Sequence, residues 1–193
     1  MRLTLLLALL LSAFSLPTAA QTKHPRRVQQ PQAPAVKLYQ EVETTYDKFE
    51  NRTSVSVGPM PLKSNPSVKF SLVVMFDYPG NVPPADVDEG EASGWVYLVL
   101  QSDTQDIVLS EHDRMVIIAD GERLVFPKMH YNSDSRGRKI TERRGVFTSR
   151  RAISQMANAG QVEGRMGVYD FTLTPGQTKA LRDFLAAIPP ARK

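Results

Sequence analysis

The chain has 193 residues, enough for one domain of ordinary size and too few for two large ones. It contains no cysteine, which excludes disulfides, thiolate metal sites and cysteine nucleophiles. The formal net charge of +4 comes from four basic residues ahead of residue 37, so the remaining 20 basic and 20 acidic residues balance. A neutral domain of this kind is a poor fit to nucleic-acid binding.

The first twenty residues have the pattern of an export signal. Arg2 supplies a positive end, residues 3–16 form an apolar core, and residues 18–20 (Thr-Ala-Ala) offer a small-residue cleavage site. The apolar run is shorter than the roughly 18 residues of a membrane span. We therefore expect a signal peptide over residues 1–20 and a periplasmic or secreted protein. An uncleaved anchor is the alternative.

The segment that follows predicts a linker. Residues 21–36 are rich in glutamine and proline and show no apolar periodicity, so they cannot bury enough surface to offset the entropy of ordering. We expect this segment to be flexible or extended. Residues 37–193 then form a single globular domain.

The domain as a whole predicts six to eight strands, most of them in its first two thirds. These strands are indicated by runs of residues that are either alternately apolar and polar or apolar throughout. The expected strands are residues 37–47, 53–57, 68–77, 95–100, 115–119, 122–126 and 139–148. Residues 37–47 have helix as the alternative, and the pattern over 139–148 is the weakest. Asp120-Gly121 predicts a tight primed turn, and hence a hairpin, because both positions readily take positive φ. Residues 134–138 are interpreted as an exposed loop.

The last forty residues carry the clearest local signals. Ser149 predicts the N-cap of a short helix ending near Gly160. Residues 162–173 predict a strand with its aromatic side buried and, because glycines flank Met166, a bulge or a close backbone approach there. A closing helix over residues 175–188 has a capping box, a proline at its first position and one apolar stripe.

Strands followed by helices predict an α+β fold, mainly antiparallel sheet with a short helix and a C-terminal helix packed on it. We expect the closing helix to cover one face of the sheet or to plug an open end. A β-sandwich with an appended C-terminal helix is the alternative.

No motif points to catalysis, a cofactor or a metal. The three histidines are far apart, and residues 111–113 (Glu-His-Asp) favour an exposed turn over a metal site. The acidic run 86–91 departs from the EF-hand pattern, and Ser93 lacks the glycine spacing of a nucleophile elbow. We predict no cofactor and no metal, and name no catalytic residue.

One charge concentration implies a partner. Residues 136–151 carry seven basic residues against Glu142 alone. Guanidiniums bind phosphate, sulfate or carboxylate through paired hydrogen bonds. Phe147 is the only aromatic residue in the stretch, so no stacking platform for nucleic acid is visible there. The candidate ligand-binding residues are Arg143, Arg144, Arg150, Arg151, Arg136 and Arg138.

The sequence thus favours an exported, non-enzymatic domain that binds an anionic cell-envelope polymer, a lipid headgroup or an acidic protein through an arginine-rich surface. One alternative is an extracytoplasmic hydrolase using carboxylate chemistry in the 86–91 loop. Another is a purely structural envelope protein that pairs through exposed strand edges. The sequence leaves open the oligomeric state, the specific ligand, and whether Asn51 of Asn51-Arg52-Thr53 carries a glycan.

Overall fold

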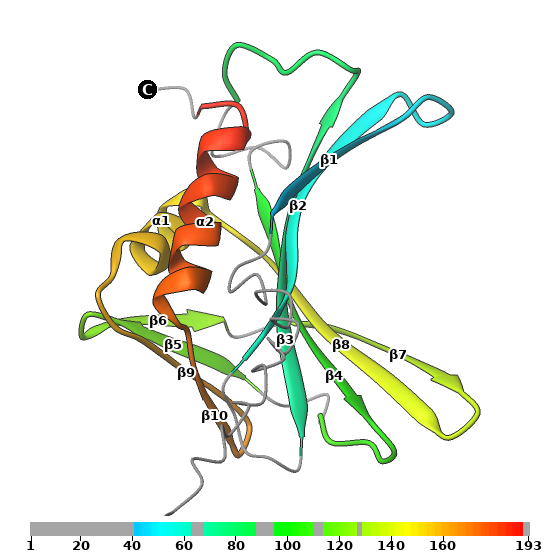
Figure 1. The fold of residues 1–193 in the computed structure, drawn as a ribbon, viewed down its shortest axis with the longest axis vertical. Helices are drawn as coiled ribbons and strands as arrows, with labels where there is room; N and C mark the ends of the chain where they lie inside the picture. Colours follow the sequence, from blue (N-terminus) through cyan, green and yellow to red (C-terminus); the bar gives the residue numbers. More distant parts are fainter. Residues whose placement is uncertain (1–40, 63–67, 88–94, 110–113, 127–128, 191–193) are drawn as a thin grey trace, which may run out of the picture. The chain divides into compact units, whose positions relative to one another are not determined.

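The computed structural model describes residues 41–62, 68–87, 95–109, 114–126 and 129–190 (Figure 1). These ranges belong to one compact unit, Val36–Lys193. The predicted signal peptide and linker lie outside the described residues. The described part holds ten strands in two antiparallel sheets and two helices, which confirms the predicted α+β class.

The large sheet has six strands. Neighbouring strands pair antiparallel throughout. In order across the sheet they are β1 (Val42–Asp47), β2 (Arg52–Pro61), β3 (Lys69–Pro79), β4 (Val96–Thr104), β8 (Lys139–Thr148) and β7 (His130–Arg136). The β1–β2 and β7–β8 hairpins therefore form the two edges of this sheet.

The small sheet has four strands. Their order is β10 (Tyr169–Thr172), β9 (Val162–Met166), β5 (Met115–Ala119) and β6 (Glu122–Phe126). The predicted β5–β6 hairpin is confirmed, and its turn residues Asp120 and Gly121 have φ of 47° and 86°, as a tight primed turn requires.

Both predicted helices are present, and each begins directly after its predicted N-cap residue. In α1 (Arg150–Asn158) the Ser149 hydroxyl accepts the backbone N–H of Ala152. In α2 (Pro175–Ala187) the full capping box of Thr174 and Gln177 is present, with Pro175 at the start. These caps satisfy N–H groups that have no partner within the helix, so both helix starts are set locally.

The core lies between the inner face of the large sheet, both helices and the small sheet, which share one side of the large sheet in Figure 1. Alternate residues of β3 and β4 point into it, among them Leu72, Val74, Leu98 and Leu100. Ile153 and Met156 of α1 and Leu181 and Phe184 of α2 are fully buried against them. The helices are therefore part of the core and not an appendage to a sandwich.

Two predictions about the strands are wrong. Residues 162–173 form the β9–β10 hairpin and not one strand. Gly167, at φ 58°, turns the chain where a bulge or a close backbone approach was expected. The expected loop over 134–138 is the end of β7 followed by a turn at Gly137. All seven residues of β7 are exposed, so no hydrophobic alternation marked this strand in the sequence.

Candidate functional site

The two adjacent arginines of strand β8, Arg143 and Arg144, lie on opposite faces of the large sheet. Arg143 is exposed on the outer face, the face turned away from the helices, whereas the Arg144 side chain is only 1% exposed. Side chains alternate along a strand, so neighbours cannot share a face. Arg150, the first residue of α1, is also buried, at 7% exposed. Contrary to the prediction, Arg144 and Arg150 cannot contribute to an exposed basic surface.

The two buried arginines pack against aromatic rings. The Arg144 guanidinium carbon lies 4.9 Å from the centroid of the Tyr131 ring, and its Nη1 donates to the Met129 carbonyl at 3.4 Å. The Arg150 guanidinium carbon lies 4.9 Å from the centroid of the Phe76 ring. A desolvated cation over a ring is a favourable contact. These side chains therefore belong to the packing of the interior.

Glu142, the acidic residue within the basic stretch, is fully buried and contacts the same Tyr131 side chain as Arg144 does. Its carboxylate accepts hydrogen bonds from Ser102 Oγ at 3.1 Å and from the Tyr131 hydroxyl at 3.0 Å. It also accepts the backbone N–H groups of Val108 at 2.8 Å and Leu109 at 3.1 Å. A buried carboxylate with four donors is well satisfied. Glu142 therefore anchors the segment after β4 to the sheet.

The Tyr131 hydroxyl is held as a neutral donor in this cluster. Although the residue as a whole is exposed, partial burial of the Tyr131 hydroxyl, reinforced by the neighbouring Glu142 carboxylate, raises its pKa above the ordinary value. These effects outweigh the hydrogen bond with Ser133 and the Arg144 charge, which lower that pKa. Tyr131 therefore stays protonated at neutral pH.

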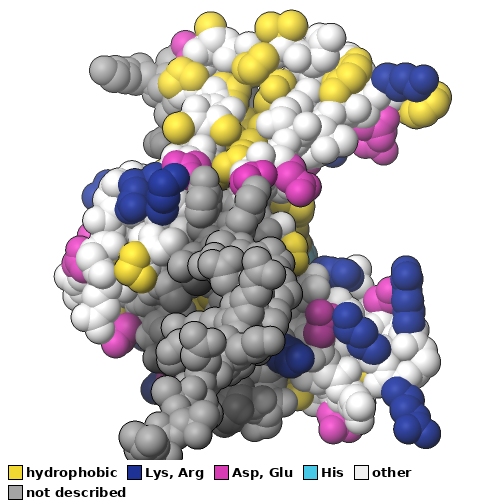
Figure 2. Space-filling view, viewed as in Figure 1, with side chains coloured by type: hydrophobic (Ala, Val, Ile, Leu, Met, Phe, Trp, Pro, Cys, Tyr) yellow, Lys and Arg dark blue, Asp and Glu magenta, His cyan; other side chains and the backbone are white. Residues whose placement is uncertain are grey.

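The outer face carries the exposed basic residues at one end. We call Lys69, Arg136, Arg138, Lys139 and Arg143 the basic end; they come from β3, β7, β8 and the β7–β8 turn. They line two adjoining hollows of about 830 and 280 Å³. Figure 2 shows Lys and Arg side chains gathered over the β7–β8 hairpin.

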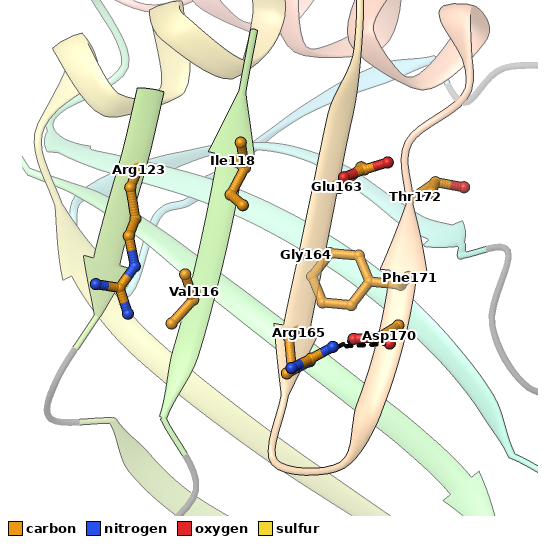
Figure 3. Close-up of a pocket in the computed structure, with 9 residues that line it drawn as sticks. All are labelled: Val116, Ile118, Arg123, Glu163, Gly164, Arg165, Asp170, Phe171 and Thr172. Carbon is orange, nitrogen blue, oxygen red and sulfur yellow. Dashed lines mark hydrogen bonds and ion pairs between the residues drawn. The ribbon is translucent and has the colours of Figure 1, made fainter. Parts of the chain in front are cut away.

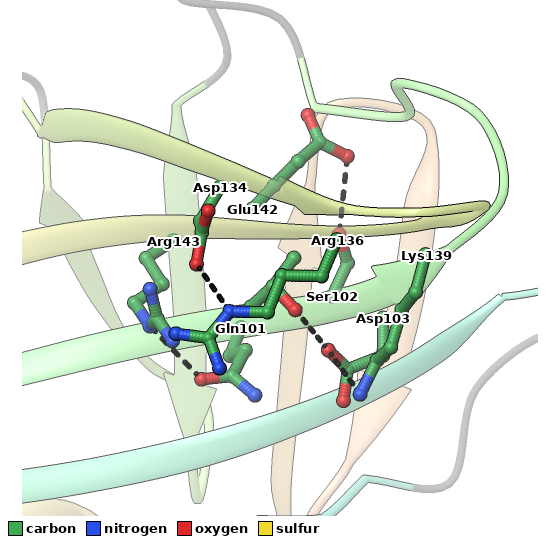
Figure 4. A network of polar contacts seen from close by, with 9 residues as sticks. Gln101, Ser102, Asp103, Asp134, Arg136, Lys139, Glu142 and Arg143 are labelled. Atoms are coloured by element: carbon green, nitrogen blue, oxygen red, sulfur yellow. Dashed lines mark hydrogen bonds and ion pairs between the residues drawn. The ribbon is translucent and has the colours of Figure 1, made fainter.

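Part of this positive charge is already paired (Figure 4). Lys139 Nζ lies 3.3 Å from Asp103 Oδ1, and Arg136 Nε lies 3.4 Å from Asp134 Oδ2. Arg143 Nε donates to Gln101 Oε1 at 3.1 Å, a neutral partner. Exposed pairs of this kind are weak and are screened by salt, so an incoming anion can compete for them.

Positive charge remains in excess at the basic end. Its five cations share the lining of the two hollows with three carboxylates, Asp103, Asp106 and Asp134. Lys69 and Arg138 form no ion pair with any acid among the described residues. The face therefore offers cations to a ligand from solvent.

Asp103 is the acid most tightly held there. Partial burial alone would raise the pKa of its carboxyl, but hydrogen bonds from Thr141 and Lys139 and the Lys139 charge outweigh burial and lower that pKa. Asp103 is therefore ionised at neutral pH and positions the Lys139 ammonium.

The sixth predicted arginine is not part of this group. Arg151 is exposed on α1, which packs against α2 on the inner side of the large sheet. The structure thus brings together Arg136, Arg138 and Arg143 and separates Arg151 from them. Sequence reasoning missed Lys69, which lies about 70 positions away. Its outward position in the alternating 68–77 run was the available signal.

The outer face of the small sheet has a second hollow, of about 710 Å³ (Figure 3). Val116 and Ile118 supply apolar surface, and the Arg165 guanidinium pairs with Asp170 through two hydrogen bonds of 2.5 and 3.1 Å. That hydrogen bonding holds the pKa of the Asp170 carboxyl below its ordinary value. Glu163, the second acid that lines this hollow, accepts a hydrogen bond from the Gln161 side-chain amide at 2.7 Å, so both carboxylates already have partners.

The other candidate metal-binding and catalytic residues named from the sequence are only partly among the described residues. Ser93, the Glu-His-Asp triplet at 111–113 and most of the acidic run 86–91 lie outside the described residues. Among the residues that the structure does describe, no three His, Asp or Glu side chains are grouped so as to hold a metal ion. Within the same residues, no helix has the length and apolar character needed to cross a membrane.

Comparison of the chain with protein-family models, curated proteins and solved structures finds no significant match. The geometry of the described residues is therefore the basis for the functional proposals.

Proposed function

We propose that this protein is an exported, non-enzymatic binding domain that holds an anionic polymer of the cell envelope at its basic end. The observation that carries the proposal is the gathering of five cations from separate strands around one open face. The signal-like residues 1–20 support export.

The shape of the basic end favours a polymer over a single headgroup. Arg143 and Lys139 lie on the same face of β8 four residues apart, a separation of about 13 Å in a strand. Arg136 and Arg138 extend the positive surface across the β7–β8 turn. A chain with regularly spaced acidic groups can contact several of these cations at once, each through charge-assisted hydrogen bonds.

The test is a triple variant, Arg136→Ala, Arg138→Ala and Arg143→Ala, passed over immobilised polygalacturonate and polyphosphate. The matched control removes three exposed arginines elsewhere, Arg114→Ala, Arg123→Ala and Arg151→Ala. Arg144 and Arg150 stay intact because their loss would disturb the core. We expect wild type and control to bind at low salt and the triple variant to bind about tenfold more weakly, since three exposed contacts at about 0.5 kcal/mol each approach the 1.4 kcal/mol of a tenfold change.

The outcomes separate the candidate ligands. Equal retention of both triple variants, or retention that is insensitive to salt, contradicts the proposal. Binding only to phosphatidylglycerol vesicles assigns the face to lipid headgroups, and binding only to polyglutamate assigns it to an acidic protein.

A further inference from the structure

The other end of the same outer face carries a cluster of aromatic side chains. We call Trp95, Tyr97 and Phe147 the aromatic end. Phe147 lies with its ring centroid 6.4 Å from that of Trp95 and 4.8 Å from that of Tyr97, at interplanar angles of 59° and 41°. Trp95 is 43% exposed and Phe147 51% exposed, so these rings pack together without entering the core. A surface cluster of large apolar rings of this kind typically marks a binding site.

These rings form one wall of a cavity of about 510 Å³ with a polar rim. Glu50 and Asn51, in the β1–β2 turn, lie on the rim with Arg52 and Asp77 of the adjoining strands. The Arg52 and Asp77 side chains pair at 3.7 Å, and Asp77 also accepts the Ser54 hydroxyl at 2.6 Å. The rim therefore offers carboxylate, amide and guanidinium groups, some of them already held in place.

A glycine on β8 fixes where the Tyr97 side chain of this wall can lie. A Cβ atom on Gly145 would lie 1.9 Å from the Tyr97 hydroxyl oxygen, so the tyrosine reaches across β8 only because residue 145 has no side chain. Burial raises the pKa of the Tyr97 hydroxyl, which therefore stays protonated. The Tyr97 part of the aromatic wall is thus in place before any ligand arrives, which lowers the cost of binding.

We propose that this cavity binds one sugar ring of an oligosaccharide chain. The C–H faces of a sugar ring pack on aromatic surfaces, while its hydroxyls need donors and acceptors around the edge. The aromatic wall supplies the apolar surface, and the rim supplies two carboxylates, one amide and one guanidinium. Such groups suit sugar hydroxyls, which both donate and accept hydrogen bonds. The cavity shares no residue with the basic end, so this proposal stands independently of the proposed anion site.

The distance between the aromatic end and the basic end indicates which kind of ligand would contact both. Phe147 and Arg143 are four residues apart on the same face of β8, about 13 Å along the strand. An acidic polysaccharide has sugar rings for the aromatic end and charges for the basic end, at a spacing that one chain can cover.

The sole tryptophan of the protein, Trp95, makes the test direct. The full chain is titrated with cellohexaose, chitohexaose and maltohexaose, and the intrinsic fluorescence is recorded. We expect a saturable change with at least one of them, with a Kd in the millimolar range or tighter. Phe147→Ala and Asp77→Asn should each weaken this binding by about tenfold, since each removes a contact worth roughly 1–1.5 kcal/mol.

The matched controls isolate the cavity. Val168→Ala removes an even more exposed apolar side chain at the β9–β10 turn, away from the cavity, and should bind the oligosaccharide as wild type does. The triple arginine variant should lose polygalacturonate binding and keep the fluorescence response. Thermal unfolding of each variant establishes that it is folded.

Three outcomes overturn the sugar proposal. One is no saturable response to any of the three oligosaccharides up to about 10 mM, well above a millimolar Kd. The second is an equal loss of response in Val168→Ala and Phe147→Ala. The third is a response to choline alone, which would make the rings a cage for a quaternary ammonium group. Loss of anion binding with the sugar response intact would overturn only the function proposed above.

Discussion

Arg143 and Arg144 are neighbours in the chain and have opposite roles in the structure. Arg143 lies in solvent on the outer face, bonded to a neutral amide, while Arg144 is buried over the Tyr131 ring. The same contrast holds for carboxylates: Glu142 is buried with four donors, and Asp103 on the outer face pairs with Lys139. Polar groups on the inner face serve the fold, whereas those on the outer face retain capacity to bind a ligand.

The sharpest test of this contrast replaces each arginine by alanine. Arg144→Ala should lower the free energy of unfolding by about 3 kcal/mol, because it empties a large buried site and breaks up a buried polar cluster. Arg143→Ala should change it by less than about 0.5 kcal/mol, as an exposed substitution does. Urea denaturation at pH 7 measures both. Similar values for the two variants would contradict the division between faces.

A smaller effect is expected at two glycines that each lie under an aromatic ring. A Cβ on Gly164 would lie 2.1 Å from Phe171 Cζ, and the Phe171 side chain is 2% exposed. A Cβ on Gly145 would meet the end of Tyr97, which is only half-buried. Gly164→Ala should therefore cost about 2 kcal/mol, as overpacking in a core does.

Gly145→Ala should cost less, because the Tyr97 ring can turn toward solvent. It should, however, alter the Trp95 fluorescence and weaken the oligosaccharide response. Denaturation midpoints and fluorescence spectra of the two variants test this ordering. A larger loss of stability for Gly145→Ala would show that the outer aromatic end is part of the core.

The smallest expected effect concerns an exposed carboxylate that resembles Glu142 in its bonding. Asp120 accepts the backbone N–H groups of Gly160 and Gln161 at 3.0 and 2.9 Å, and these bonds lower the pKa of its carboxyl. Because the folded pKa lies below the unfolded value of about 3.9, the ionised form stabilises the fold above that pH, and the stabilisation is lost as the pH falls through the folded pKa.

Asp120→Asn keeps a residue that tolerates positive φ in the turn and removes the charge. The stability advantage of the wild type over this variant should therefore be present at pH 7 and shrink as the pH falls below the ordinary aspartate pKa of about 3.9. Thermal midpoints at several pH values measure it. An advantage that is constant with pH would assign the effect to the turn and not to the carboxylate.

Much of the fold could be predicted from local sequence. The capping residues Ser149 and Thr174 mark both helices, Asp120-Gly121 marks a hairpin, and alternation marks β3. Strand β7 could not be found, since a strand exposed on both faces carries no hydrophobic alternation. Its pairing with β8 forms through backbone hydrogen bonds, which leave no trace in residue type.

Less of the candidate site than of the fold could be predicted from the sequence. A count of charge marked residues 136–151 correctly as basic, but it could not separate Arg143 from Arg144 without knowing which face of β8 is buried. Lys69 joins the basic end through pairing of β3 with β4. Trp95 and Phe147 meet because β4 pairs with β8.

The sequence by itself determined the class of the fold, the starts of both helices and the β5–β6 turn, because those depend on hydrogen bonds and dihedral preferences within a few residues. Only the tertiary structure decided which arginines reach solvent and which aromatic rings gather on the outer face. Those outcomes depend on strand order and register, through which segments tens of residues apart become neighbours, and a shift of one residue would exchange the two faces.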